Sequence, residues 1–256
     1  MLNVQTDYAK IACRYDEDRE KYHGQRDEYL AAFVAAHRHP PVKVLDLGCG
    51  SGLWLRDQVQ FFKDRPVSFV GVEPSDEMRA RAQEKLGPDV VRAGRAEAIP
   101  FEAGSFDLIT SHFAFHHFTD KEAAIAEIAR VVRPGGSFRL FNVAPEYSPN
   151  WWLYRYFPEA VALDALRFWK VAKIQNLFRD LGWQVATSIE PSTDRLTHQD
   201  AMHVAERRVT SQFAILSDVD YERGLKRLER DDEDFFGRGL VPSEMRLVTM
   251  VCTRTV

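Results

Sequence analysis

The stretch Val44-Leu-Asp-Leu-Gly-Cys-Gly-Ser-Gly52 decides the fold of this chain. An apolar segment (42–47) runs directly into three alternating glycines, and a helix-like segment (53–62) follows them. Glycine adopts positive φ angles and lets a ligand approach the backbone closely. The stretch therefore predicts a strand, a ligand-binding turn, and a helix whose free N–H groups face an anionic ligand group.

The same alternation of strand and helix continues along the chain. Ser75 is predicted to cap a helix with an apolar face, and Arg133–Gly136 is predicted to end another. The further strands of this region are expected at 67–72, 90–91, 106–110 and 137–143. Since alternating strands and helices form parallel sheets, we expect an α/β fold. It would be a doubly wound, mostly parallel, seven-stranded, Rossmann-like sheet with a helical cap.

The chain is expected to form one domain over residues 1–256. Its expected parts are a helical N-terminal lead (1–39), a ligand-binding core (40–145), and cap helices with closing strands (146–256). The residues expected to be helical in the last part include 194–234, where Ser217 and Asp220 form a capping-box pattern. The closing strands are predicted at 183–189 and 246–256.

Charge and cysteine content narrow the class of partner. The formal net charge of −4 lacks the basic excess of a general nucleic-acid binder, so we expect no nucleic acid. No apolar run of about 18 residues is present, so no membrane span is expected. Cys13, Cys49 and Cys252 are widely spaced and form no disulfide or zinc pattern. Free thiols, and an N-terminus without a signal-peptide pattern, lead us to expect a cytoplasmic protein.

The spacing of the glycines and acids separates two classes of cofactor. A dinucleotide fingerprint counted from Gly48 would need a glycine where this chain has Leu53. Asp46 would repel a pyrophosphate but attract a sulfonium compound that carries an α-ammonium group. Glu73, at the end of the second strand, can accept hydrogen bonds from both hydroxyls of a ribose.

Four stretches together resemble class I S-adenosylmethionine-dependent methyltransferases. They are VLDLGCGSG (44–52), VGVEPSDEM (70–78), GRAEAIPFEAGSFDLITSHFAFHHF (94–118) and VVRPGG (131–136), and the lead-in YAKIACRYD (8–16) is also similar. The resemblance is strongest to the small-molecule group that contains the ubiquinone- and menaquinone-biosynthesis enzymes. It implies S-adenosyl-L-methionine as cofactor and methyl transfer by in-line displacement to a small-molecule acceptor.

The resemblance also implies a set of cofactor-binding residues. The members of this set are Tyr15, Asp46, Gly48, Cys49, Gly50, Glu73, Pro74, Met78, Arg95, Ala96, Glu97, Ser111 and Phe113. The glycine turn with Asp46 would hold the methionine part, and Glu73 would bind the ribose. Tyr15 would fold over the cofactor.

The remaining members of the set would contact the adenine and the reacting methyl group. Pro74 and Met78 would pack on the adenine, while Ser111 and Phe113 would line the methyl-transfer channel. The family often has an acid where this chain has Arg95. Either the backbone of residues 95–97 reads the adenine edge, or Glu97 takes the place of that acid.

Histidines and aromatic residues supply the candidates for catalysis and acceptor contact. His116, His117 and Tyr15 are candidate general bases, although a structural or pocket-lining role is the alternative for the histidines. His112, His116 and His117 lack acidic or cysteine partners at a metal-ligand spacing, so we expect no metal. His23 and the aromatic segment 147–157 could contact the acceptor, and that segment could equally pack inside the cap.

Three rival functions are consistent with parts of the pattern. They are an NAD-dependent oxidoreductase, which Leu53 disfavours, a methyltransferase-like protein that binds the cofactor or activates a partner, and a nucleic-acid methyltransferase. The chain lacks an Asn-Pro-Pro-Tyr-type motif for base methylation. The acceptor, its methylated atom and the oligomeric state stay open at this stage.

Overall fold

The computed structural model describes residues 12–20, 23–37, 40–192, 196–208, 210–230, 240–241 and 243–255. The chain divides into two compact units. The sheet unit comprises Tyr8–Asn142, Ile174–Thr187 and Thr249–Val256, and the helical unit includes Val143–Lys173 and Ser188–Val248. The single-domain organisation stays a prediction.

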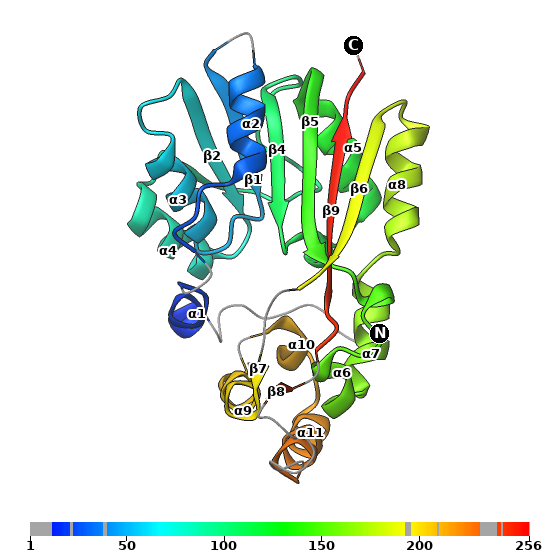
Figure 1. The fold of residues 1–256 in the computed structure, drawn as a ribbon. Helices are drawn as coiled ribbons and strands as arrows, with labels where there is room; N and C mark the ends of the chain where they lie inside the picture. Colours follow the sequence, from blue (N-terminus) through cyan, green and yellow to red (C-terminus); the bar gives the residue numbers. More distant parts are fainter. Residues whose placement is uncertain are drawn as a thin grey trace. The chain divides into compact units, whose positions relative to one another are not determined.

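A seven-stranded sheet forms the centre of the sheet unit, in the order β3-β2-β1-β4-β5-β9-β6 (Figure 1). The strands are β1 (Val42–Leu47), β2 (Val67–Glu73), β3 (Val91–Ala93), β4 (Phe106–His112), β5 (Val132–Val143), β6 (Gln184–Pro191) and β9 (Arg246–Thr253). β1 pairs in parallel with β2 and β4, β2 with β3, and β4 with β5. β9 runs opposite to its neighbours (Figure 1). The predicted mostly parallel, Rossmann-like sheet is confirmed, with β9 as an antiparallel strand between β5 and the edge strand β6.

Helices cover both faces of this sheet (Figure 1). They are α2 (Glu28–Ala36), α3 (Leu53–Phe61), α4 (Asp76–Leu86), α5 (Lys121–Val131) and α8 (Val171–Asp180). Helix α1 (Ala12–Arg19) lies beyond the strand ends, below α3 and α4 in Figure 1. A 3-10 turn, η3 (Phe115–His117), precedes α5. Leu30 of α2 packs with Val44 and Leu108 of the central strands. Phe178 of α8 stacks on Phe138 of β5 with ring centroids 5.4 Å apart. Burial on both faces explains why the strands read as apolar runs.

The prediction that the strand after α5 begins only at residue 137 is wrong. Residues 133–136 already belong to β5 and do not form a turn between α5 and the strand. Phe106 pairs with Val132 but Leu108 pairs with Ser137, so the register shifts over this segment. Gly135 has a φ of 79°. The Arg-Pro-Gly-Gly run therefore forms an irregularity inside the strand, because backbone pairing continues on both sides of it.

The helical unit has an aromatic core of its own. Its elements are η4 (Pro145–Tyr147), α6 (Trp152–Tyr156), α7 (Glu159–Arg167), α9 (His198–Arg207), α10 (Ser211–Ala214), α11 (Asp218–Arg230) and the strand pair β7 (Leu196–Thr197) and β8 (Leu240–Val241). Its buried aromatic residues include Trp151, Trp152, Tyr154, Tyr156, Phe157, Phe213 and Tyr221. The segment 147–157 therefore supplies packing, which was one of its two predicted roles. Of the capping box predicted at Ser217 and Asp220, the structure shows the Asp220 N–H donating to the Ser217 hydroxyl at 3.1 Å, while that hydroxyl donates to Asp220 Oδ2 at 2.6 Å.

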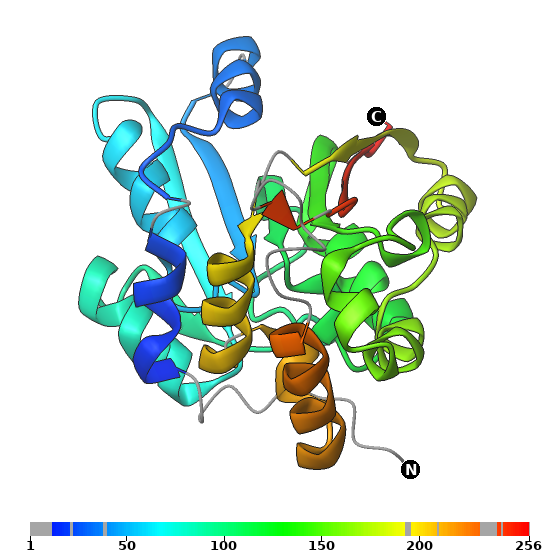
Figure 2. The same ribbon diagram turned by 60° about the horizontal axis from the view of Figure 1, so that its bottom comes forward.

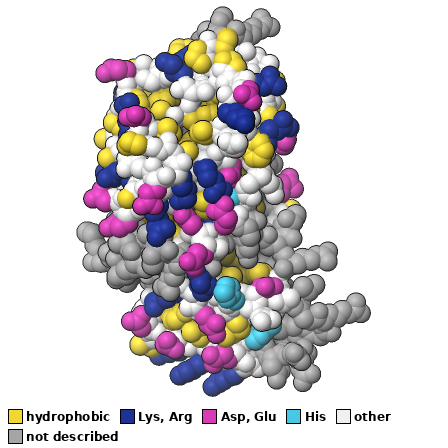
Figure 3. Space-filling view, turned by 90° about the vertical axis from the view of Figure 1, so that its left-hand side faces the viewer, with side chains coloured by type: hydrophobic (Ala, Val, Ile, Leu, Met, Phe, Trp, Pro, Cys, Tyr) yellow, Lys and Arg dark blue, Asp and Glu magenta, His cyan; other side chains and the backbone are white. Residues whose placement is uncertain are grey.

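The distribution of surface charge and the length and polarity of the helices concern possible partners. Lysine and arginine side chains alternate with aspartate and glutamate over the face drawn in Figure 3. Within the described ranges, every helix is too short or too polar to cross a membrane.

Candidate active site

The glycine turn lies at the carboxyl end of β1 and requires its glycines. Gly48, Gly50 and Gly52 have φ angles of 78°, 56° and 80°. A Cβ on Gly48 would lie 2.6 Å from the Ala114 Cβ, and one on Gly52 would lie 2.9 Å from the Ala82 Cβ. Larger residues are therefore excluded by backbone conformation and by space. This segment, residues 48–52, is called the glycine loop below.

Asp46 is a buried carboxyl directly before the glycine loop. Its side chain is 2% exposed, and the Thr110 hydroxyl donates to it at 3.4 Å. Burial raises the pKa of Asp46 to about 8, opposed by the Thr110 bond and reinforced by the charges of Glu73 and Asp27. No lysine, arginine or histidine of the described ranges forms an ion pair with Asp46. Because a buried carboxylate is costly without a positive partner, this position suits a cationic ligand group.

Glu73 brings a second carboxyl to the same loop from the end of β2. Its Oε2 accepts from the Gly50 N–H and its Oε1 from the Ser75 N–H, both at 2.9 Å. The side chain is 7% exposed, and burial raises the pKa of Glu73 while these amide bonds oppose the rise. The structure thus brings Asp46 and Glu73 to one edge of the sheet, as the sequence predicted from two separate motifs.

Three further predicted residues lie around this pair. Met78 of α4 is buried, and its Cε would be 3.6 Å from a Cβ placed on Gly50. Pro74 is exposed at the end of β2. The Cys49 sulfur packs toward Gly71 of β2, where an added Cβ would lie 2.7 Å away. Burial, with the charges of Asp46 and Glu73, raises the pKa of the Cys49 thiol well above its usual value, so Cys49 contributes packing.

Arg95 and Glu97 bind the segment before α5. The Arg95 guanidinium donates to the Thr119 hydroxyl at 2.7 Å and lies 3.3 Å from Glu97 Oε2. Glu97 Oε1 accepts from the backbone N–H groups of Thr119 and Asp120. Ala96, between them, is buried. Glu97 Oε1 thus accepts two amide bonds and Oε2 pairs with a guanidinium, so this carboxylate is more fully occupied than that of Glu73, whose oxygens accept one bond each. This favours the backbone of residues 95–97 over the Glu97 carboxylate as the group that reads the ligand.

The end of β4 carries a strained aromatic residue. Phe113 has a φ of 51° and is 43% exposed, and its ring meets Phe141 edge-on at 5.0 Å. A bulky side chain rarely adopts a positive φ, and such strain concentrates at functional sites. Ser111, two residues earlier, is fully buried, and its hydroxyl has no hydrogen-bond partner within the described structure.

The candidate bases His116 and His117 lie together in η3. Their ring centroids are 3.9 Å apart, and His116 is buried with its Nδ1 3.3 Å from Asn142 Nδ2. Within the described ranges, no cluster of three or more histidine, cysteine or acidic side chains has the geometry of a metal site. The hydrogen bond between Asn142 and His116 orients the His116 ring, and the sequence did not suggest this contact.

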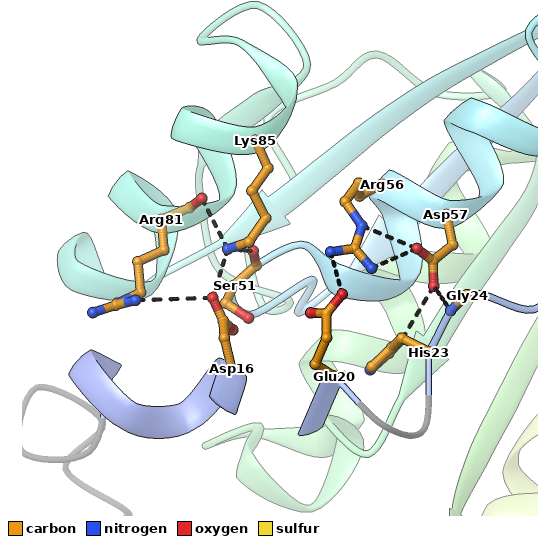
Figure 4. A network of polar contacts seen from close by, with 9 residues as sticks. All are labelled: Asp16, Glu20, His23, Gly24, Ser51, Arg56, Asp57, Arg81 and Lys85. Carbon is orange, nitrogen blue, oxygen red and sulfur yellow. Dashed lines mark hydrogen bonds and ion pairs between the residues drawn. The ribbon is translucent and has the colours of Figure 1, made fainter. Parts of the chain in front are cut away.

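Helix α1 holds Tyr15 and lies beside α3 and α4 (Figure 2). Tyr15 is half-buried, and the Arg19 guanidinium carbon lies 5.6 Å from the centre of its ring. Ion pairs from α1 to the two neighbouring helices fix its place (Figure 4). His23, a predicted acceptor contact, lies with its Nδ1 3.5 Å from Asp57 Oδ2, and burial lowers the pKa of its ring.

A polar cluster centred on Asp27 was missed by reasoning from motifs. Arg139 forms an ion pair with Asp27, and the Trp54 indole N–H donates to it at 3.3 Å. The His112 ring lies over Trp54 at 4.4 Å, and burial lowers the pKa of His112 to about 3, so it is neutral. The sequence signal was Arg139 itself, a charge within the apolar run of β5.

The family model for a methyltransferase domain matches residues 45–140, which include the glycine loop, Asp46 and Glu73. Demethylmenaquinone methyltransferase of Lactiplantibacillus plantarum is 30% identical over 171 residues, which cover 59% of this chain and 69% of that protein. The chain belongs to the methyltransferase family. The methyltransferase YcgJ of Bacillus subtilis is 34% identical over 152 residues, 57% of either chain. The chain thus spans a little over half of YcgJ's length.

Solved structures of methyltransferases show the same fold as this chain. The YcgJ crystal structure aligns with a TM-score of 0.59 at 19% identity and covers 88% of this chain and 97% of its own. Phosphoethanolamine N-methyltransferase 2 of Haemonchus contortus, solved with S-adenosylhomocysteine, aligns with a TM-score of 0.54 at 18% identity. That alignment covers 90% of this chain and 52% of the Haemonchus chain.

Proposed function

We propose that this chain is an S-adenosyl-L-methionine-dependent methyltransferase that acts on a small-molecule acceptor. The observation that carries the proposal is Asp46, a buried carboxyl beside the glycine loop that lacks a positive partner among the described side chains. S-adenosylmethionine offers this position an α-ammonium group and a nearby sulfonium, and both favour the ionised carboxyl.

Each residue of the loop region has a role in holding the cofactor. Asp46 binds the α-ammonium group, while Gly48 and Gly50 admit the methionine part against the backbone. Glu73 accepts hydrogen bonds from the ribose hydroxyls; its existing bond from the Gly50 N–H keeps the carboxylate directed at the loop. With these roles, both buried carboxyls, Asp46 and Glu73, contact a group of the cofactor.

The residues on either side of the loop region contact the adenine and the methyl group. Pro74 and Met78 pack against the adenine, and the backbone of residues 95–97 reads its edge. Ser111 and Phe113 line the path between cofactor and acceptor. The fixed backbone of Phe113, whose N–H donates to the Phe141 carbonyl at 2.8 Å, supports a rigid wall there.

Positioning is the main catalytic task of this site. S-adenosylmethionine, when bound, supplies a methyl group already activated by the sulfonium. The protein then aligns the acceptor for in-line displacement and excludes water. A base is needed only for an acceptor that loses a proton, and His116, His117 and Tyr15 are the candidates for that role.

A methyl-transfer assay tests the proposal. The purified protein would be supplied with S-adenosylmethionine labelled on its methyl carbon and with a panel of acceptors. The name of the Lactiplantibacillus plantarum relative makes a demethylated naphthoquinol the first choice, followed by phenols and amines. We expect transfer to one acceptor class, lost in Glu73→Ala and retained in Glu77→Ala, a control on the exposed side of α4. Binding of S-adenosylhomocysteine without transfer to any acceptor would instead favour the cofactor-binding, partner-activating alternative.

A further inference from the structure

Helix α1 is fastened to both helices that flank the glycine loop (Figure 4). Asp16 and Glu20 are four residues apart, so their carboxylates lie on one side of a helical turn. Asp16 Oδ2 lies 2.7 Å from Lys85 Nζ on α4, and Glu20 Oε1 lies 2.8 Å from Arg56 Nη1 on α3. Asp16 therefore joins α1 to α4, and Glu20, the residue directly after α1, joins the end of this helix to α3.

Lys85 also contacts the glycine loop itself. Its ammonium donates to Asp16 at 2.7 Å, to the Ser51 carbonyl at 3.0 Å and to the Arg81 carbonyl at 3.2 Å. An ammonium has three donors, and these contacts use all of them. The Ser51 residue is 2% exposed and lies inside the loop. One partly buried cation thus connects α1 directly to the loop that holds the cofactor.

A second group of contacts fixes the chain that follows α1. Asp57 of α3 binds Arg56 through Oδ1 at 2.7 Å and accepts from the Gly24 N–H through Oδ2 at 2.6 Å. The His23 ring lies beside the same Oδ2. Glu20 is 54% exposed at its side chain, whereas Asp16 and Lys85 are 18% and 21% exposed. The pair of Asp16 and Lys85 is therefore the less solvated anchor, and the one that salt screens less.

We propose that Lys85 is a positioning residue that holds α1 against the glycine loop, so that the cofactor enters and leaves when the Asp16–Lys85 pair opens. This inference rests on the proposed function. A contact that closes the free protein lowers the fraction of molecules able to admit the cofactor. The same contact slows the departure of bound cofactor. Breaking it accelerates both steps, whereas simple loss of a binding contact accelerates dissociation alone.

Rapid-mixing kinetics with S-adenosylhomocysteine test this inference, with tryptophan fluorescence as the signal. We expect Lys85→Met and Asp16→Asn each to raise both the association and the dissociation rate constants roughly tenfold, the effect of one charge-assisted hydrogen bond. In the double variant the effects should add up to less than the sum of the single ones, since the Asp16–Lys85 bond is common to both, although Lys85→Met also loses the Ser51 contact and Asp16→Asn the Arg81 contact at 3.8 Å. Lys85→Arg, which keeps the charge, should restore most of the slow exchange.

The controls separate this inference from the proposed function. Arg223→Met breaks an exposed ion pair with Asp220 on α11 and should leave both rates unchanged. Asp16→Asn serves if Lys85→Met does not fold. Unchanged association in both variants, with normal binding by the parent protein, would overturn the role of Lys85. Failure of the parent protein to bind S-adenosylhomocysteine would overturn the proposed function instead.

Discussion

The protonation of Asp46 predicts that cofactor binding releases a proton. A carboxyl with a pKa of about 8 is about 90% protonated at pH 7. If Asp46 binds an α-ammonium group, it does so as the carboxylate, so its proton leaves on binding. We therefore expect Asp46 to release roughly 0.9 proton for each S-adenosylhomocysteine bound at pH 7.

The same ionisation makes affinity depend on pH. The ionised fraction of Asp46 falls from about a half at pH 8 to about 1% at pH 6, which weakens binding by up to about 50-fold, or ~2.3 kcal/mol. Calorimetric titrations in two buffers of different ionisation enthalpy give the number of protons released. Asp46→Asn should bind weakly and remove this share of the release. The share that remains belongs to other groups, including Glu73, whose pKa burial also raises.

Absence of proton release at pH 7, together with an affinity that stays flat between pH 6 and 8, would refute this reasoning. Glu77→Gln, a change on the exposed side of α4, is the matched control and should behave as the parent protein. Equal proton release by the parent protein and by Asp46→Asn would also contradict the role assigned to Asp46.

Three further predictions concern the same region. The pKa of Asp46 in the folded protein lies above its usual value of 3.8, so the stability of the parent protein falls as pH rises toward 8. Asp46→Asn should therefore raise the free energy of unfolding in urea at pH 7 by at most about 4 kcal/mol. Gly48→Ala should weaken S-adenosylhomocysteine binding at least tenfold in calorimetry, because its Cβ meets Ala114, whereas Gly24→Ala, also at a positive φ but in open space, should not. Arg139→Met should cost about 3 kcal/mol in urea unfolding because Asp27 loses its charged partner, and Asp27→Asn added to it should recover part of that loss.

The cofactor site could be predicted because its signals are local. The glycine loop, Asp46 and Glu73 each follow an apolar strand within a few residues. Parallel strands bring their carboxyl ends to one edge, so topology alone places Asp46 near Glu73. The left-handed φ angles of the loop and the lack of space for a Cβ at Gly48 require glycine, and this is why the loop can be predicted from the sequence.

The ion pairs that fasten α1, and the pair of Asp27 with Arg139, could not be predicted because their partners are distant in sequence. Asp16 and Lys85 are 69 positions apart, and Asp27 and Arg139 are 112 apart. Acidic and basic residues are numerous, so composition does not say which of them pair. Only the odd placement of Arg139 inside an apolar strand hinted at a buried partner.

The roles of the segment 147–157 and of the run 133–136 also could not be decided from the sequence. Aromatic residues in the segment 147–157 suit a ligand pocket or a small core equally well, and burial of side chains such as Trp152 and Phe157 identifies the core. Pro134 and Gly135 indicate a turn by composition. A strand with an irregular register accommodates them because pairing with β4 resumes at Ser137.

The most direct test of the central claim is a calorimetric titration of the parent protein with S-adenosylhomocysteine and, separately, with NADH. The methyltransferase assignment predicts micromolar binding of S-adenosylhomocysteine alone, lost in Glu73→Ala. Absent binding of S-adenosylhomocysteine, or tight binding of NADH, would contradict it and would mean that the glycine loop serves a different cofactor.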